Sequence, residues 1–111
     1  MRVVEIFNSI QGEGAYTGYA ASFVRLAGCN LRCHWCDTKQ SWHLSDGYEL
    51  ATIEIADRCR RRIVIITGGE PLLHDLSPLV TILHDRGQRV HLETNGTLPL
   101  PDGINLNWVT V

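Results

Sequence analysis

The sequence has no apolar stretch long enough to cross a bilayer and no signal-peptide core after Met1. We therefore expect a soluble protein of the reducing cytoplasm, without a membrane partner. A formal net charge of only -2 gives no electrostatic reason to expect nucleic-acid binding. The 111 residues contain no repeat, low-complexity tract or linker, which indicates one domain or a piece of one.

Cysteine is scarce, and three of the four cysteines are close together. Cys29, Cys33 and Cys36 follow the spacing C-x3-C-x2-C. Three thiolates can hold a [4Fe–4S] cluster and leave one iron open to another ligand. The same thiolates with His34 or His43 would suit a structural zinc site, although such sites usually use two separated ligand pairs. A disulfide is typical of secreted chains, so it is the weakest interpretation of the motif.

The fourth cysteine, Cys59, lies far along the chain in a segment with a helical pattern. We expect it to be a buried helix cysteine without a chemical role. The only basic run, residues 58–62, falls at the end of the same predicted helix. Cations complement the helix dipole there, so the run is interpreted as a solvated helix end.

Strands and helices alternate along the sequence. Apolar and β-branched runs predict strands at 3–7, 22–26, 63–66, 89–93 and 106–111, and a loop at 11–18. Capping by Thr52 predicts a helix to about Arg61, with Glu54 and Arg58 as an ion pair. A second helix is predicted from Ser77 to a stop at Gly87. This order indicates an α/β fold of parallel strands with crossover helices, as a layer or part of a barrel.

Glycine-containing motifs follow two of the predicted strands. Thr-Gly-Gly-Glu-Pro, residues 67–71, comes directly after the apolar strand 63–66, and Glu-Thr-Asn-Gly, residues 93–96, ends the next strand. Ligands of parallel α/β folds bind at the carboxyl ends of strands. Glycines let the backbone approach a ligand closely, and strand-end carbonyls can accept hydrogen bonds from an ammonium group. A lone Gly-Gly would be an ordinary turn, but this position predicts a ligand site.

Together these motifs resemble the radical S-adenosylmethionine superfamily, and within it the 7-carboxy-7-deazaguanine synthase family of the queuosine pathway. The matching segments are residues 5–14, 23–29, 35–38, 67–71 and 93–96. Ser-Ile-Gln-Gly-Glu-Gly, residues 9–14, is the most specific, because related activating enzymes share the other signals but not this one. Activating enzymes for anaerobic ribonucleotide reductase or pyruvate formate-lyase are the alternative within the superfamily. A non-catalytic cluster or zinc protein is the alternative outside it.

The resemblance implies a lyase that converts 6-carboxy-5,6,7,8-tetrahydropterin into 7-carboxy-7-deazaguanine with loss of ammonia. It implies a [4Fe–4S] cluster, S-adenosylmethionine and Mg²⁺ as cofactors, and an electron donor such as flavodoxin. A 5′-deoxyadenosyl radical would take a hydrogen from C6 of the pterin, and S-adenosylmethionine would be regenerated. The full-length protein is expected to be a homodimer.

Residue roles follow from the same resemblance. The expected cluster ligands are Cys29, Cys33 and Cys36. The expected contacts to S-adenosylmethionine are Trp35 near the adenine, Gly68, Gly69 and Glu70 at the methionine end, and Glu93 and Asn95 as further contacts. Gln11 and Glu13 match pterin-binding positions, Arg25 matches a carboxylate-binding position and Thr38 matches a Mg²⁺ ligand.

Several residues have plainer interpretations. Without the motif, Gln11, Glu13 and Arg25 would be a capped loop and a surface charge. The histidines receive no role, because scattered histidines are more often surface or packing residues; they are His34, His43, His74, His84 and His91.

The last predicted strand runs to Val111 with no turn or cap after it. An uncovered apolar strand is an exposed edge that complete domains usually protect. In the resembling family, further strands and helices follow at this point. We therefore expect residues 1–111 to be the amino-terminal portion of the radical S-adenosylmethionine core, a single incomplete domain.

Overall fold

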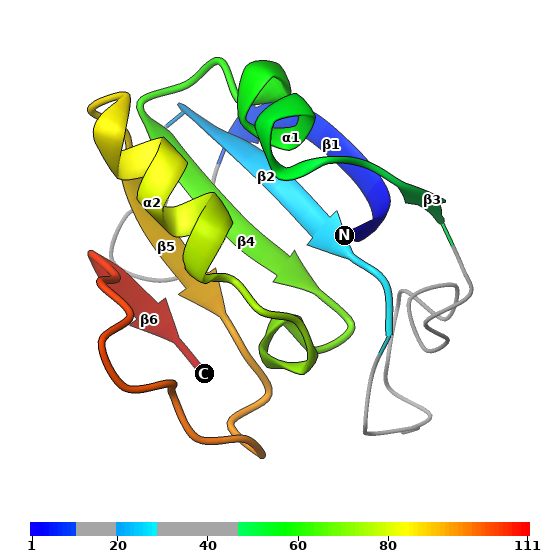
Figure 1. Cartoon of the computed structure of the whole chain (residues 1–111), viewed down its shortest axis with the longest axis vertical. Helices are drawn as coiled ribbons and strands as arrows, with labels where there is room; N and C mark the ends of the chain where they lie inside the picture. Colours follow the sequence, from blue (N-terminus) through cyan, green and yellow to red (C-terminus); the bar gives the residue numbers. More distant parts are fainter. Residues whose placement is uncertain (11–19, 29–46) are drawn as a thin grey trace.

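The computed structural model describes residues 1–10, 20–28 and 47–111. Predictions for residues 11–19 and 29–46 lie outside these ranges. The elements follow in the order β1 (Arg2–Ile10), β2 (Ala20–Leu26), β3 (Tyr48–Glu49), α1 (Thr52–Arg58), β4 (Ile63–Gly68), the 3-10 helix η2 (Pro71–Leu73), α2 (Ser77–Asp85), β5 (Arg89–Glu93) and β6 (Trp108–Thr110) (Figure 1).

The strands form one six-stranded sheet in the order β3-β1-β2-β4-β5-β6. Strands β2, β4, β5 and β6 run parallel to one another, which confirms the predicted α/β fold. Strand β1 is antiparallel to both β2 and β3. The alternation of strands and helices did not predict these two pairings, because no helix separates β1 from β2 and the two-residue β3 is too short to leave a pattern.

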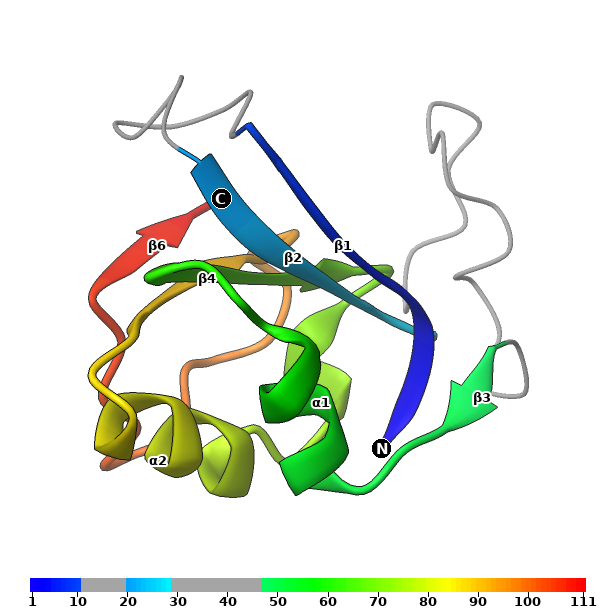
Figure 2. The same ribbon diagram turned by 90° about the horizontal axis from the view of Figure 1, so that it is seen from above.

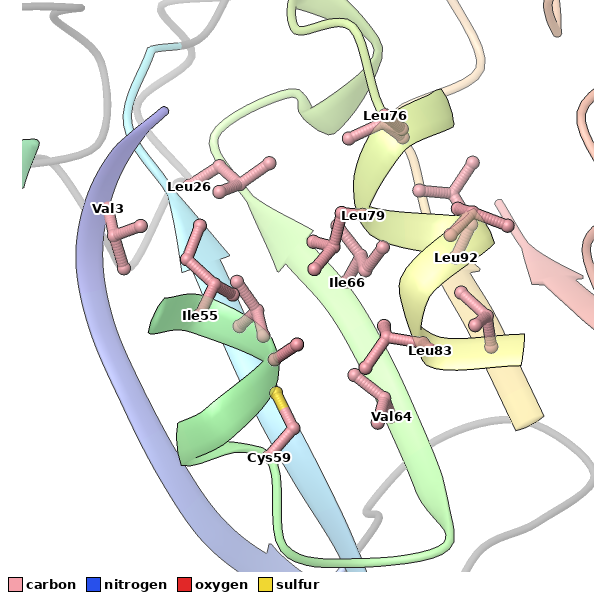
Figure 3. Packing of buried hydrophobic residues seen from close by; sticks show 14 of the residues in the cluster. Val3, Leu26, Ile55, Cys59, Val64, Ile66, Leu76, Leu79, Leu83 and Leu92 are labelled. Atoms are coloured by element: carbon pink, nitrogen blue, oxygen red, sulfur yellow. The ribbon is translucent and has the colours of Figure 1, made fainter. Parts of the chain in front are cut away.

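Both helices pack on the same face of the sheet, as Figure 2 shows from above. The main core lies between this face and the helices (Figure 3). Helix α2 contributes Leu79 and Leu83, both fully buried, as the predicted apolar face requires. Strand β4 contributes Val64 and Ile66 to the same layer, because alternate residues of a strand point to one face. The predicted extent of α2 is confirmed, with Gly87 at a φ of 76° just beyond its end.

The opposite face of the sheet carries a second, smaller apolar cluster. Phe7 and Phe23 stack there with ring centroids 4.9 Å apart, next to Ile65. The side-chain period of two then places Arg25 and Thr67 on this same face, one step closer to the carboxyl ends of their strands. The helix-free face is therefore apolar at its centre and polar where the strands end.

Helix α1 is shorter than predicted. It ends at Arg58, Ala51 is its N-cap, and Thr52 is the first helical residue, so Thr52 does not cap it. The predicted pair of Glu54 and Arg58 is replaced by other contacts. A Glu54 carboxylate oxygen lies 3.4 Å from the Ala51 amide nitrogen, and Arg58 donates to the Tyr48 hydroxyl over 3.4 Å.

Tertiary hydrogen bonds explain why the basic run does not continue α1. The side-chain amide of Gln88 donates to the carbonyls of Cys59 and Arg61, at 2.8 Å each. The Arg61 amide donates to the Ser22 hydroxyl at 2.9 Å. These partners replace intrahelical bonds, and residues 59–62 are not helical. Cys59 is buried as predicted but caps the helix, and burial raises the pKa of its thiol to about 11.

The last strand is also shorter than the predicted segment 106–111, since β6 comprises Trp108–Thr110. Asn107 still joins β5, because its amide donates to the Val90 carbonyl and its side-chain oxygen accepts from the Val90 amide, both at 2.8 Å. Among the helices that the structure describes, none has the length and apolar character needed to span a bilayer.

Candidate functional site

A cavity of about 210 Å³ lies at the carboxyl ends of β4, β5 and β6. Its lining comes from three strand ends, and consists of Thr67, Gly68, Gly69, Glu93, Thr94, Thr110 and Val111. Parallel strands end at one edge of a sheet, so motifs far apart in the sequence meet there. The structure thus brings together Gly68, Gly69 and Glu93, three of the predicted cofactor contacts.

The packing of the sheet leaves no room for a side chain at Gly68. It pairs with Leu26 of β2, and its φ is 155°. A Cβ atom at Gly68 would lie 2.4 Å from the Leu26 carbonyl oxygen and 2.9 Å from the Leu26 amide nitrogen. The close approach that Gly68 permits is therefore between two strands of the sheet.

Glu70 connects three segments at this edge of the sheet. Its side chain is fully buried, and its carboxylate accepts hydrogen bonds from the Thr94 hydroxyl, at 2.9 Å to Oε2, and from the Asn95 amide, at 3.2 Å to Oε1. The Glu70 amide donates to the Gly28 carbonyl at 2.6 Å. Because a buried carboxylate is costly without such partners, this network ties the loop after β4 to the loop after β5 and to the end of β2.

Asn95 shapes the loop that follows β5. Its side-chain oxygen accepts hydrogen bonds from the Thr97 amide at 3.0 Å and the Thr97 hydroxyl at 2.6 Å. An Asn that bonds to the backbone two residues ahead stabilises a tight turn. The turn holds the Asn95 amide toward Glu70, which supports the same network.

Arg25 lies on the helix-free face beside the cavity. Its Nε donates to a carboxylate oxygen of Glu5 at 2.9 Å, and its side chain is 22% exposed. Its register partner on β4 is Thr67, which lines the cavity. The pairing with Glu5 orients the guanidinium group along the polar end of this face.

Seven predicted site residues lie outside the described residues, and their roles stay predictions. They are Gln11, Glu13, Cys29, Cys33, Trp35, Cys36 and Thr38. Within residues 1–10, 20–28 and 47–111, no group of three or more His, Cys, Asp or Glu side chains is placed to hold a metal ion. The interpretation of the cysteines as cluster ligands therefore rests on their spacing.

Two residues of this site received no role from the sequence. Thr94 is the hydroxyl partner of the buried Glu70 carboxylate, and its position inside the motif 93–96 was the available signal. His74 lies with Nε2 2.6 Å from the carbonyl oxygen of Ala27. Its only signal was its place three residues after the motif 67–71.

If cavity volume were the only criterion, two other cavities would be chosen as the candidate site. A cavity of about 540 Å³ at the amino ends of the strands is lined by four arginines: Arg60, Arg61, Arg62 and Arg86. Another, of about 230 Å³, lies between α2 and residues 103–105. Neither is lined by residues of the strand-end motifs, so the residues that could bind a cofactor favour the cavity at the carboxyl ends.

Known proteins resemble the chain in sequence and in structure. A curated 7-carboxy-7-deazaguanine synthase from Hyperthermus butylicus is 55% identical over 106 residues, which cover 91% of this chain and 45% of that protein. A curated 7-carboxy-7-deazaguanine synthase from Synechocystis is 42% identical over 112 residues, which cover 98% of this chain and 53% of that protein. The crystal structure of QueE from Escherichia coli matches with a TM-score of 0.81 at 35% identity, covering 99% of this chain and 59% of that chain.

The chain spans about half the length of the curated relatives it matches. The family described as the Radical SAM superfamily matches residues 23–106, which include the cysteine motif and both strand-end motifs. A match over most of the chain shows that it belongs to the radical SAM superfamily.

Proposed function

We propose that the chain forms the cofactor-binding part of a 7-carboxy-7-deazaguanine synthase, a lyase that converts 6-carboxy-5,6,7,8-tetrahydropterin into 7-carboxy-7-deazaguanine and ammonia. The observation that carries the proposal is the cavity lined by Gly68, Gly69 and Glu93, tied through Glu70 to the residue before the cysteine motif. The names of the relatives supply the product, and the proposed substrate follows from the family that the sequence resembles. Residues 1–111 act as a single domain in this proposal.

Superfamily membership implies a [4Fe–4S] cluster and S-adenosylmethionine, which supply a carbon-centred radical when bound. The three thiolates of the cysteine motif suit a cluster with one open iron. We assign Cys29, Cys33 and Cys36 as its ligands and Trp35 as a contact of the adenine. The Glu70 amide donates to the Gly28 carbonyl, so the residue before Cys29 is held close to the residues that line the cavity, which supports this assignment.

The methionine end of S-adenosylmethionine is assigned to the cavity. The backbone at Gly68 and Gly69 and the Glu93 carboxylate line it and offer acceptors for an ammonium group. Glu70 is fully buried and bonded to the loop that contains Asn95. These two residues therefore act on the cofactor mainly by holding the backbone around the cavity.

The pterin is assigned to the polar end of the helix-free face. Arg25 lies there on the strand next to the cavity, and a guanidinium group can bind a carboxylate through two parallel hydrogen bonds. We assign Gln11 and Glu13 to the pterin ring and Thr38 to a Mg²⁺ ion. A reductant such as flavodoxin and a homodimeric full-length protein complete the proposal.

Product formation tests the proposal. Protein reconstituted anaerobically with iron and sulfide receives dithionite, S-adenosylmethionine, Mg²⁺ and the carboxylated tetrahydropterin, and 7-carboxy-7-deazaguanine is measured by mass spectrometry. Because the chain spans about half of its relatives, the assay uses the chain alone and the chain joined to the part of the Hyperthermus butylicus relative that it does not match.

The expected result is product from the joined protein and little or none from the chain alone. Circular dichroism and iron analysis establish that each protein is folded and loaded. Cys33→Ala in the joined protein is the matched control and should give no product. Cleavage of S-adenosylmethionine without product, in a folded and loaded protein, would contradict the proposed substrate. Stoichiometric zinc without iron would contradict the superfamily chemistry itself.

A further inference from the structure

Three consecutive carbonyl groups at the end of β2 accept hydrogen bonds from one short segment. The Leu26 carbonyl accepts from the Gly69 amide at 3.3 Å, and the Gly28 carbonyl accepts from the Glu70 amide at 2.6 Å. Between them, the Ala27 carbonyl lies 2.6 Å from Nε2 of His74. Two of the donors are backbone amides, which any residue except proline would supply. The third is a side chain, so it depends on the identity of residue 74.

These bonds surround a special backbone position. Gly28 has a φ of 96°, in the region that residues with a side chain rarely adopt. The peptide before Gly28 carries the Ala27 carbonyl, and the peptide after it carries the Gly28 carbonyl. His74 therefore holds one side of this turn and the Glu70 amide holds the other, an arrangement that we term the Gly28 clasp.

The position of His74 is itself set by local structure. Its amide donates to the Pro71 carbonyl at 3.0 Å, which closes the 3-10 turn η2. The proline at the start of this turn has a fixed φ, and Pro71 is buried. The imidazole ring thus extends from a rigid turn toward the end of β2. Because a carbonyl only accepts hydrogen bonds, the contact requires the tautomer with the proton on Nε2.

We propose that His74 is a positioning residue for the iron–sulfur cluster. Its Nε2–H group holds the Ala27 carbonyl and so determines the direction in which the chain leaves β2, two residues before the proposed ligand Cys29. Since a peptide group is planar, the same bond also orients the Gly28 amide. The inference rests on the proposed function, because it takes Cys29 as a cluster ligand.

The expected consequence concerns the cluster more than the fold. Ligands must be held within about half an ångström for a well-formed site, and residues that touch only the backbone around a ligand can change cluster properties. A misdirected loop should therefore release iron faster and alter how the cluster responds to S-adenosylmethionine.

Three variants of the reconstituted protein test the inference. His74→Leu removes the donor, and His74→Gln keeps an N–H donor at a similar reach, since the glutamine amide carries two donors. His84→Leu is the matched control, because Nε2 of His84 lies 3.0 Å from the Asn107 side-chain oxygen, on α2 and away from the clasp. The readouts are the rate of iron loss to a chelator, the electron paramagnetic resonance spectrum of the reduced cluster with and without S-adenosylmethionine, and the unfolding midpoint of the apo-protein.

His74→Leu should lose iron about fivefold faster than the wild type and give a changed spectrum with S-adenosylmethionine, the effect expected for one lost hydrogen bond. His74→Gln should restore most of both properties. His84→Leu should keep the wild-type values whatever its unfolding midpoint. Wild-type iron loss and spectrum in His74→Leu would overturn the inference, as would equal defects in the Leu and Gln variants.

A measurement on the wild type covers the case in which His74→Leu does not fold. Nitrogen-15 chemical shifts of the imidazole report the tautomer in the apo-protein, and the inference requires the proton on Nε2. A proton on Nδ1 alone would overturn it. If the wild type itself assembles no [4Fe–4S] cluster, the proposed function fails. If the wild type assembles the cluster and the His74 variants behave like it, only the role of His74 fails.

Discussion

The two ends of the parallel strands differ in what their polar residues do. At the amino ends, four exposed arginines line the larger cavity, and Arg86 pairs with the exposed Asp57 at 2.8 Å. At the carboxyl ends, the cavity is smaller, and its lining residue Thr94 and the neighbouring Asn95 amide both donate to the fully buried Glu70. Charge in water is weakly constrained, whereas a buried carboxylate fixes the geometry of its partners. The proposed functional end is therefore distinguished by a buried network and not by cavity size or charge.

The cysteines provide the sharpest way to test this comparison. Cys29→Ala, Cys33→Ala or Cys36→Ala should abolish the broad visible absorbance of a reconstituted [4Fe–4S] cluster, because each removes one of three thiolate ligands. Cys59→Ala should leave the absorbance intact, since Cys59 is buried at the amino end of the sheet and its raised pKa keeps it a neutral thiol. Full cluster content in any one of the first three variants would contradict the assignment.

Removing the buried carboxylate should cause the largest loss of stability. Glu70→Ala leaves the Thr94 hydroxyl and the Asn95 amide without their acceptor, and should lower the free energy of unfolding by about 3 kcal/mol. Asp57→Ala, at the amino ends, removes only an exposed ion pair and should cost about 0.5 kcal/mol. Urea unfolding of the apo-protein measures both. Similar losses in the two variants would erase the proposed difference between the ends.

Two glycines sharpen the comparison further. Gly68→Ala should cost about 2 kcal/mol, because the new Cβ would lie 2.4 Å from the Leu26 carbonyl and push β4 away from β2. Gly87→Ala introduces a side chain at a φ of 76° into open space, so it should cost only about 1 kcal/mol of backbone strain. The same urea titrations measure both changes. A smaller cost at Gly68 than at Gly87 would show that the strands separate easily.

Arg25 tests whether the polar end of the helix-free face binds the substrate. In the joined protein described above, Arg25→Lys should weaken pterin binding about tenfold, because lysine cannot form two parallel hydrogen bonds with a carboxylate. Cleavage of S-adenosylmethionine without substrate should persist. Arg89→Lys, an exposed arginine at the amino end of β5, is the control and should leave the Michaelis constant for the pterin unchanged. Unchanged pterin affinity in Arg25→Lys would remove Arg25 from the site.

The smallest expected effect concerns His91, which lies between the two ends on β5. Burial lowers the pKa of His91, with a further lowering by Arg89. The unfolded chain therefore binds a proton more readily than the folded protein, so stability should fall as the pH drops below about 6.5, the ordinary histidine value. His91→Gln should show a weaker dependence between pH 7.5 and 5.5 in urea unfolding. If the free energy of unfolding depended equally on pH in both proteins, His91 would not be the group responsible.

The sequence predicted well where the pattern is local. The run of apolar residues at β4, and the proline and glycine around α2, each act within a few residues, and both elements lie where they were expected. The end of α1 was wrong, because Ser22 and Gln88 lie far away in the sequence and take the hydrogen bonds that would have continued the helix.

The candidate site likewise has features that the sequence predicted and features that it did not. The spacing of the cysteines and the strand-end motifs are sequence properties, and they were enough to indicate the superfamily and the edge of the sheet where the candidate cavity lies. The burial of Glu70 and the contact of His74 with the Ala27 carbonyl arise only when β2 and β4 lie side by side, because hydrogen bonds between distant segments depend on the packing of the sheet. The sequence alone thus determined which chemical groups are present, and only the tertiary structure decided which of them hold the site in place, since short-range patterns carry no information on which distant partners meet.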